Sequence, residues 1–305
     1  MTPQNHTSLE TPAAFTDAVK VASRPAGKIA SSRRRVSDKL GMFRKTIAAV
    51  GTANAFWLEL SRLIYRLGLR KVVPLFTFSL PGIKHTVYLR TGTSDYNVFL
   101  HVFVLKTYGA SLPPEYPPKL IIDCGANVGY ASVYFLNRFP TATVVAVEPE
   151  PGNIAICERN LAPYGDRAVL AKSAVWSQVC ELELLRSAPH SEQSTQVCEP
   201  SGSNAATVPA VDIPTLMELG GGRTVDLLKI DVERSELELF TKGQERWLPR
   251  VRNIAIELHG RDCSEAFFSA LEGYNYSRIH YEDTTICRDI ARRLQMTANV
   301  PMGRS

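Results

Sequence analysis

The stretch IIDCGANVGYAS, residues 121–132, decides the fold. Apolar residues run into an acid, Asp123, and two glycines follow with Asn127 between them, before a helix-like pattern begins. This order is typical of a buried strand, a glycine loop and the start of a helix. Three uses fit such a loop: it binds a phosphate, it binds another nucleotide-like cofactor, or it only turns the chain in an ordinary core.

Strand-like and helical patterns alternate along the chain after this loop. Each strand candidate is a short apolar run, and each is followed by a polar or amphipathic segment. Two closing runs, SRIHYED and TTICRDI, are typical of an antiparallel pair at a sheet edge. This alternation predicts an α/β fold with a doubly wound, mainly parallel sheet. The further strand candidates are 142–148, 167–175, 225–231 and 251–260.

The chain before and after this region has a different character. The composition of residues 1–42 predicts a disordered basic tail. The pattern of residues 43–110 predicts an extension of helices and short strands. Within the extension we expect a helix over 43–69, strands in LFTFSL and HTVYLR, and a helix capped by Ser94 or Asp95. We expect the main domain over 111–290 and a flexible C-terminus over 291–305.

The positive charge lies in the tail. Residues 1–45 hold nine Lys or Arg side chains against three acidic ones, whereas the whole chain carries a net charge of +5. The folded body is therefore close to neutral, and we expect no nucleic-acid partner. Six cysteines without a CxxC pair are typical of reduced thiols, and we expect a cytoplasmic protein.

Two segments leave membrane contact open. The run SSRRRVS in the basic N-terminus could bind anionic lipid, although a solvated tail is the simpler interpretation. The run TIAAVGTANAFWLELSRLIYRLGLRK could form an amphipathic helix on a membrane surface, but such a pattern more often packs on its own domain. No segment has the apolar length of a membrane span.

The residues around the glycine loop select its ligand. A dinucleotide loop reads G-x-G-x-x-G, but Asn127 stands in place of the middle glycine and would crowd a pyrophosphate. Asp123 adds a negative charge that repels phosphate. Glu148 ends the next strand, nineteen residues after Gly129, where an acid can bind ribose hydroxyls. The loop therefore favours a cationic, phosphate-free adenosine cofactor, and S-adenosyl-L-methionine fits.

Six runs resemble the FkbM family of S-adenosylmethionine-dependent methyltransferases: TSDYNVF, IIDCGANVGYAS, VVAVEPEPGNIAICERN, VDIPTLMEL, VDLLKIDVERSELELF and IAIELHG. The resemblance covers roughly residues 90–260. It implies a seven-stranded Rossmann-like methyltransferase sheet and O-methylation of a hydroxyl, commonly on a sugar of a glycolipid, polysaccharide or secondary metabolite. The acceptor would be a small molecule or a glycan. The implied cofactor-binding residues are Asp123, Gly125, Asn127, Gly129, Glu148, Ser173 and Ala174.

Acidic and imidazole groups follow two later strands and supply the expected chemistry. Methyl transfer requires alignment and a base for the hydroxyl proton, so we expect Asp231, Glu233 and His259 to be catalytic. His259 is the best base by its ordinary pKa. We expect no resident metal, although these three residues and Glu257 could also supply ligands for Mg²⁺. Lys229 lies on the same strand face as Asp231 and could pair with a carboxylate.

One position departs from the family pattern. The family usually has glycine where this chain has Arg234. One hypothesis is that Arg234 faces the acceptor and prefers an anionic sugar. Two other classes of protein remain as alternatives: a nicotinamide-dependent oxidoreductase, and a non-catalytic adaptor that retains the fold.

Overall fold

The structure is a computed structural model that describes residues 31–112, 117–186, 195–200 and 206–293. The chain divides into two compact units, Met1–Gly41 and Met42–Ser305. Within the described residues, no helix is both long enough and apolar enough to cross a membrane. Most of the predicted tail and most of the predicted C-terminal segment lie outside the described residues.

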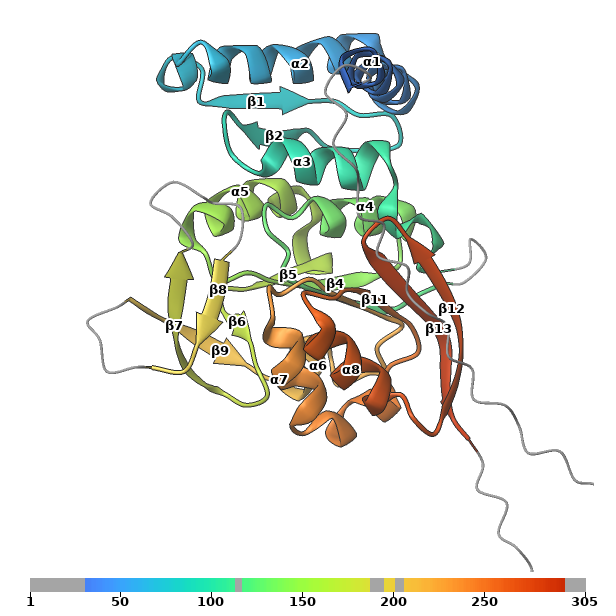
Figure 1. The fold of residues 1–305 in the computed structure, drawn as a ribbon. Helices are drawn as coiled ribbons and strands as arrows, with labels where there is room; N and C mark the ends of the chain where they lie inside the picture. Colours follow the sequence, from blue (N-terminus) through green and yellow to red (C-terminus); the bar gives the residue numbers. More distant parts are fainter. Residues whose placement is uncertain (1–30, 113–116, 187–194, 201–205, 294–305) are drawn as a thin grey trace, which may run out of the picture. The chain divides into compact units, whose positions relative to one another are not determined.

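A seven-stranded sheet forms the centre of the second unit (Figure 1). Five neighbouring strands of this sheet are parallel, because strands that are apolar on both faces are usually connected by helices that cover those faces. β13 pairs antiparallel with β11 and with β12 at one edge. The predicted sheet class and edge pair are therefore confirmed. The order is β12 (Tyr274–Tyr281), β13 (Thr284–Arg292), β11 (Ile254–Glu257), β10 (Leu227–Ile230), β3 (Leu120–Cys124), β4 (Thr143–Val147) and β5 (Ala168–Ala171).

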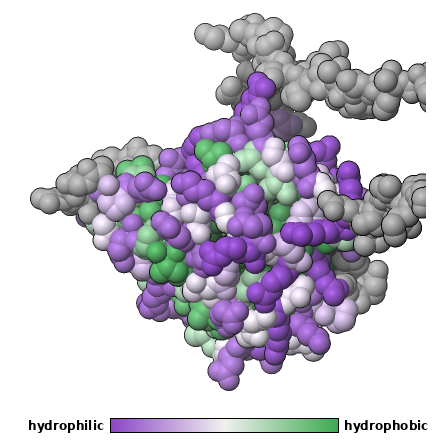
Figure 2. All heavy atoms as spheres, turned by 90° about the horizontal axis from the view of Figure 1, so that it is seen from below, coloured by the Kyte–Doolittle hydropathy of each residue, from purple (hydrophilic) through white to green (hydrophobic). Residues whose placement is uncertain are grey.

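Helices cover both faces of this sheet (Figure 1). α4 (Tyr130–Arg138) and α5 (Pro151–Leu161) lie on one face. α6 (Ile213–Leu219), α7 (Ser235–Thr241) and α8 (Arg261–Ala270) lie on the other. Two large apolar clusters fill the two sides of the sheet, as a doubly wound fold requires. The outer surface below α6–α8 is mostly hydrophilic, with smaller hydrophobic areas between (Figure 2).

The N-terminal extension packs on the same core. β1 (Leu75–Phe78) pairs antiparallel with β2 (Val87–Arg90), and both contribute to the cluster that α4 and α5 line. The predicted boundary at residue 110 therefore does not separate two compact units. α3 (Asp95–Phe99) begins where predicted, but it continues as a π-helix (Leu100–Val104) and a 3-10 turn (Thr107–Ala110).

The predicted helix over 43–69 differs from the structure in two ways. α1 (Ser31–Val50) begins inside the predicted tail, since the Arg, Lys and Leu residues there are good helix formers. α2 (Thr52–Arg66) is a separate helix, and a 3-10 turn, η1 (Leu69–Lys71), follows it. Gly51 has φ of 84° and interrupts the helical path between α1 and α2.

A second, four-stranded sheet contains strands that lie outside the predicted alternation of strands and helices. The predicted strand 167–175 is in fact two strands, β5 in the main sheet and β6 (Ala174–Val175) in a smaller one. β6 pairs with β9 (Thr207–Val211), which pairs with β7 (Cys180–Arg186), and β7 pairs with β8 (Thr195–Cys198). Lys172 and Ser173 interrupt the apolar run between the two strands, but a polar break of two residues does not by itself indicate a change of sheet.

Candidate active site

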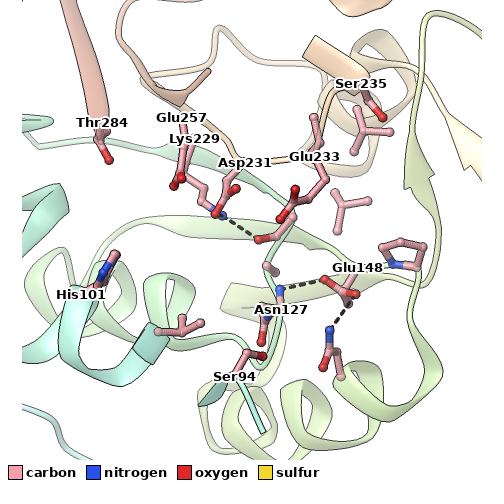
Figure 3. A pocket seen from close by; sticks show the side chains of 18 of the residues that line it. Ser94, His101, Asn127, Glu148, Lys229, Asp231, Glu233, Ser235, Glu257 and Thr284 are labelled. Atoms are coloured by element: carbon pink, nitrogen blue, oxygen red, sulfur yellow. Dashed lines mark hydrogen bonds and ion pairs between the residues drawn. The ribbon is translucent and has the colours of Figure 1, made fainter. Parts of the chain in front are cut away.

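A cavity of about 360 Å³ lies beyond the carboxyl ends of β3, β4 and β10 (Figure 3). This is where ligands bind in open α/β sheets. The glycine loop and Glu148 form one half of its wall. The acidic residues after β10 and β11 form the other half, together with the turn between β12 and β13. We call these two halves the cofactor half and the acceptor half.

The two glycines of the loop are needed for close packing. Gly125 has φ of +77°, and a Cβ there would lie 1.8 Å from the backbone oxygen of Asp231. Gly129 has φ of +82°, and a Cβ there would lie 2.9 Å from the Sγ of Cys157. Gly125 lines the cavity, whereas Gly129 does not. Gly125 therefore shapes the wall of the cavity, whereas Gly129 allows the start of α4 to pack closely against α5.

Asp123 lies beneath the loop and does not line the cavity. Its side chain is fully buried, accepts a hydrogen bond of 2.6 Å from the Oγ of Ser132 and lies 3.1 Å from the Nζ of Lys229. Lys229 also donates to the backbone oxygen of Gly125 at 2.6 Å. Burial would lower the pKa of Lys229, but the Asp123 carboxylate raises it above the ordinary value. The loop charge predicted for Asp123 is thus balanced by Lys229, and the pair holds the loop in place.

Asn127 and Glu148 form the polar wall of the cofactor half. The backbone N–H of Asn127 donates to Glu148 Oε2 at 2.8 Å. Asn127 has φ of 51°, a conformation that asparagine tolerates better than most residues. The other oxygen of Glu148 accepts from the backbone N–H of Glu150 at 3.0 Å and from the side chain of Asn153 at 3.2 Å. Burial nevertheless raises the pKa of Glu148 to about 7.

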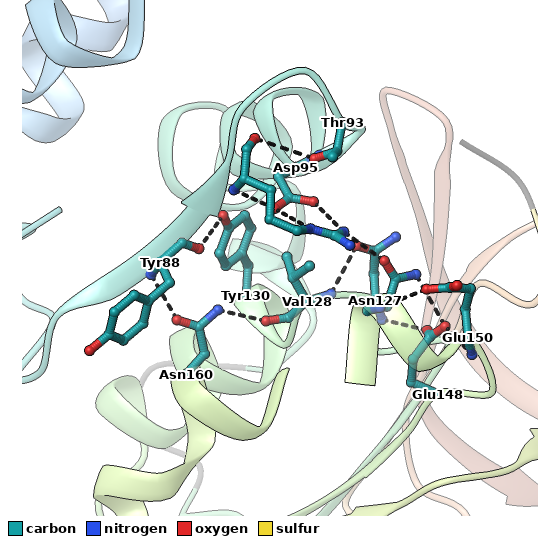
Figure 4. Close-up of polar contacts among 11 residues, drawn as sticks. Tyr88, Thr93, Asp95, Asn127, Val128, Tyr130, Glu148, Glu150 and Asn160 are labelled. Atoms are coloured by element: carbon teal, nitrogen blue, oxygen red, sulfur yellow. Dashed lines mark hydrogen bonds and ion pairs between the residues drawn. The ribbon is translucent and has the colours of Figure 1, made fainter. Parts of the chain in front are cut away.

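A hydrogen-bond chain ties Glu148 to the N-terminal extension (Figure 4). Arg90 donates to Asp95 and to Asn153, each at 2.7 Å, and Asn153 donates in turn to Glu148. Asp95 is fully buried and also accepts from the backbone N–H of Arg90. The extension therefore fixes the orientation of Glu148 in the wall of the cavity.

The same extension braces the glycine loop itself (Figure 4). Asn160 accepts from the backbone N–H of Tyr88 at 2.8 Å and donates to the backbone oxygen of Val128 at 2.7 Å. The hydroxyl of Tyr130 donates to the backbone oxygen of Tyr88 at 2.7 Å. These contacts connect β2 to the loop over long sequence separations, so local patterns did not predict them.

Ser173 and Ala174, two of the residues expected to bind the cofactor, line the same cavity. Ser173 is buried, and its Oγ has no hydrogen-bond partner within the described residues. A buried hydroxyl without a partner costs free energy, so a ligand group that hydrogen-bonds there would relieve the cost. The orphaned hydroxyl, the glycine cradle at Gly125 and the acid Glu148 together fit an adenosine cofactor.

Three carboxylates line the acceptor half: Asp231, Glu233 and Glu257 (Figure 3). Their side chains are between 27% and 35% exposed, so all three meet the cavity. Burial, followed by the charge of Asp231, raises the pKa of Glu257 to about 7. Burial also raises the pKa of Glu233 above its ordinary value. The acceptor half therefore holds a carboxyl group that exchanges its proton near neutral pH.

His259 stands behind these carboxylates and does not line the cavity. Its Nδ1 lies 2.8 Å from Glu236 Oε1, and its Nε2 lies 3.7–3.8 Å from an oxygen of each of the three carboxylates. Burial opposes the charged imidazole, but Glu236 and the other acids outweigh it and raise the pKa of His259 to about 9. The histidine is therefore protonated at neutral pH, which argues against the predicted role as the base.

The same groups could hold a divalent cation. One ligand atom from each of Asp231, Glu257 and His259 lies within 4.8 Å of the others, with Glu233 beside them. The protonated imidazole already places a positive charge in this cluster, and a metal would have to displace that proton.

Arg234 points away from the cavity. Its guanidinium forms an ion pair with Asp262 and donates to the backbone oxygen of His259 at 3.0 Å. The hypothesis that Arg234 faces the acceptor is therefore wrong. Arg234 has φ of 79°, the left-handed conformation in which the family has glycine, and its side chain instead supports the turn after β11.

The sequence reasoning missed two parts of the wall. One is the face of α3 and the turns after it; the run TSDYNVF was noted as a family motif but was given no role. The other is the turn between β12 and β13, which carries no motif. The missed lining residues are Ser94, Asn97, His101, Thr107, Tyr108, Glu282, Asp283 and Thr284.

Comparison with known proteins identifies the same region of the chain. The family model described as "Methyltransferase FkbM domain" matches residues 123–280. "Methyltransferase 1" of Beauveria bassiana is 24% identical over 182 residues, which cover 52% of this chain and 72% of that protein. "Methyltransferase sdnD" of Sordaria araneosa is 25% identical over 191 residues, covering 52% of this chain and 73% of that protein.

Among solved structures, similarity extends to the fibrillarin of Aeropyrum pernix in complex with natively bound S-adenosyl-L-methionine. The identity is 10% and the TM-score 0.37, with 60% of this chain and 71% of that chain covered.

Proposed function

Because the chain belongs to the FkbM methyltransferase family, we propose that this S-adenosylmethionine-dependent methyltransferase is an O-methyltransferase. Its acceptor is a hydroxyl group of a sugar in a glycolipid, a polysaccharide or a secondary metabolite. Neither of the two alternatives is favoured. Membership of a methyltransferase family gives no support to a nicotinamide-dependent oxidoreductase. The glycine loop and Glu148 are both present, whereas a degenerate adaptor has no need to keep them.

One observation carries the proposal of O-methyl transfer. The cavity joins an adenosine-type half, with Glu148, to a half in which Glu257 has a pKa of about 7. A hydroxyl oxygen must lose its proton as it is methylated, and a base acts best when its pKa lies near the working pH. A carboxyl group that titrates near neutrality beside the cofactor half is suited to that step.

The residues divide the work as follows. Glu148 would hold the cofactor through its ribose hydroxyls, and Ser173 would contact its adenine end. When bound, S-adenosyl-L-methionine supplies a methyl group activated by its sulfonium. Glu257 would take the proton of the acceptor hydroxyl as that oxygen is methylated at the expense of the carbon–sulfur bond of the sulfonium.

Asp231 and Glu233 orient the acceptor from the same wall, and the imidazolium of His259 keeps the carboxylates together. The positive charge of His259 also lowers the pKa of Glu257, so a larger fraction of that carboxyl group is deprotonated at neutral pH. His259 is thus a positioning residue, and Glu257 takes the role of base that the sequence analysis expected of His259.

Incubation with methyl-labelled S-adenosylmethionine and a panel of neutral and acidic glycans tests the proposal. We expect label in a methyl ether, and we expect Glu257→Gln to lower kcat about 10²-fold. Glu265→Gln, an exposed carboxylate on α8, is the matched control and should keep the wild-type rate. Label on nitrogen or carbon, or an unchanged rate in Glu257→Gln, would contradict the assignment.

A further inference from the structure

The exposed face of α2 is apolar, although the opposite face of the same helix is already packed. Ala55, Leu58 and Ser61 are buried against the core. On the outer side, Leu63 is 49% exposed and Leu67 is 62% exposed. A helix that is apolar on both sides is normally covered on both sides. The interpretation as a packed helix therefore applies to the buried face of α2, and the interpretation as a surface-binding helix applies to its exposed face.

The apolar exposure is concentrated in this segment. Seven of the twelve large exposed apolar side chains among the described residues lie between positions 56 and 72. The surface seen from below is by contrast mostly hydrophilic (Figure 2). Seven exposed apolar side chains on one short segment differ from the single, scattered ones that need no explanation on a monomer's surface. The seven, which we call the α2 surface, are Phe56, Trp57, Leu63, Tyr65, Leu67, Leu69 and Val72.

The charges around the α2 surface indicate what covers it. Arg66, Arg70 and Lys71 are exposed at the end of α2 and in η1. Glu59 is the only acid in α2 and η1, and it is already engaged by Arg62 at 3.0 Å and by the hydroxyl of Tyr96 at 2.8 Å. Cations therefore border the apolar side chains without free acids among them.

We propose that the α2 surface binds the surface of an anionic lipid bilayer. Leucine, phenylalanine and tryptophan side chains enter the boundary of the acyl chains, while lysine and arginine contact anionic headgroups. Tryptophan and tyrosine are typical of that depth. A second copy of the chain is a poorer occupant, because it would bring the same cations against each other. No spanning segment is needed for such contact, and none is found in the described residues.

Co-sedimentation of the full chain with phosphatidylcholine vesicles, with and without phosphatidylserine, tests this proposal. We expect binding only to vesicles that contain phosphatidylserine. Leu63→Ser with Leu67→Ser should weaken it about tenfold or more, since the acyl contact is lost. Reversal of Arg66, Arg70 and Lys71 to Glu should abolish it.

A matched variant distinguishes binding through the α2 surface from non-specific hydrophobic adsorption and from binding through the basic tail. Val179 and Leu219 are 66% and 49% exposed on other elements, so Val179→Ser with Leu219→Ser removes similar apolar area. That variant should bind like the wild type. Equal binding by all variants would assign the contact to the tail and overturn the proposal. Failure of the wild-type chain to bind the vesicles would also overturn the proposal. The same holds if light scattering shows a dimer that the double substitution Leu63→Ser with Leu67→Ser converts to a monomer.

Discussion

The two halves of the cavity are built on opposite principles. In the cofactor half, Glu148 is buried and accepts three hydrogen bonds from the chain, so its position is fixed before any ligand arrives. In the acceptor half, three partly exposed carboxylates crowd around one imidazolium. The first arrangement suits recognition and the second suits proton transfer. We therefore expect substitutions in the cofactor half to weaken ligand binding, and substitutions in the acceptor half to lower the catalytic rate.

The largest effect is expected where the two halves touch. Gly125→Ala places a Cβ 1.8 Å from the oxygen of Asp231, so β3 and β10 must move apart. Gly82 is the matched control, because its φ of +75° is nearly the same but nothing lies within 4 Å of its Cβ position. Denaturant unfolding should show Gly125→Ala to be less stable than Gly82→Ala by about 2 kcal/mol or more. Equal losses would mean that backbone strain alone explains the glycine.

The next effect concerns the acid of the cofactor half. Glu148→Gln should weaken binding of S-adenosylhomocysteine about 10–100-fold, because charge-assisted hydrogen bonds to the ribose are lost. In the wild type, ribose donors favour the carboxylate, so binding lowers a pKa that is about 7 in the free protein. Binding then releases a proton below that pH, and affinity should rise up to about pH 7 and level off above it. Calorimetry across this range checks the slope, and a flat wild-type profile would refute the role of Glu148.

A smaller effect is expected behind the acceptor half. His259→Phe removes a cation that lowers the pKa of Glu257, so that pKa should rise above about 7. The ascending limb of kcat against pH should move upward by about one unit, and the rate lost at neutral pH should return in alkaline buffer. His85→Phe, remote from the cavity and packed on Tyr164, is the control. A loss of rate that no pH restores would show that His259 is itself the base.

The smallest effect is expected at Arg234. Arg234→Gly relieves a left-handed conformation at a non-glycine residue but loses the ion pair with Asp262, which is roughly half exposed on both sides. These terms oppose each other, and the stability should change little, as denaturant unfolding would show. The rate on neutral and acidic glycans should change in parallel, as a comparison of kcat/KM for both acceptors would show. A switch in preference between them would restore the hypothesis that Arg234 reads the acceptor.

The sequence predicted the parts of this protein that depend on local pattern. The apolar runs located the parallel strands, and the acid and glycines after them located the cofactor half. Asp123 was misplaced because its partner Lys229 lies far along the chain. His259 was taken as a base from its ordinary pKa, whereas Glu236, Glu233 and Asp231, brought together by folding, raise that pKa. The brace from Arg90 to Glu148 also depends on contacts that no local pattern encodes.

Titration of S-adenosylhomocysteine into Glu148→Gln and Glu257→Gln, side by side with the wild-type chain, tests the division of the cavity most directly. The account predicts that Glu148→Gln loses at least about tenfold in affinity, whereas Glu257→Gln binds as the wild type does and loses only catalytic rate. Equal loss of affinity in both variants, or no binding by the wild-type chain, would contradict it.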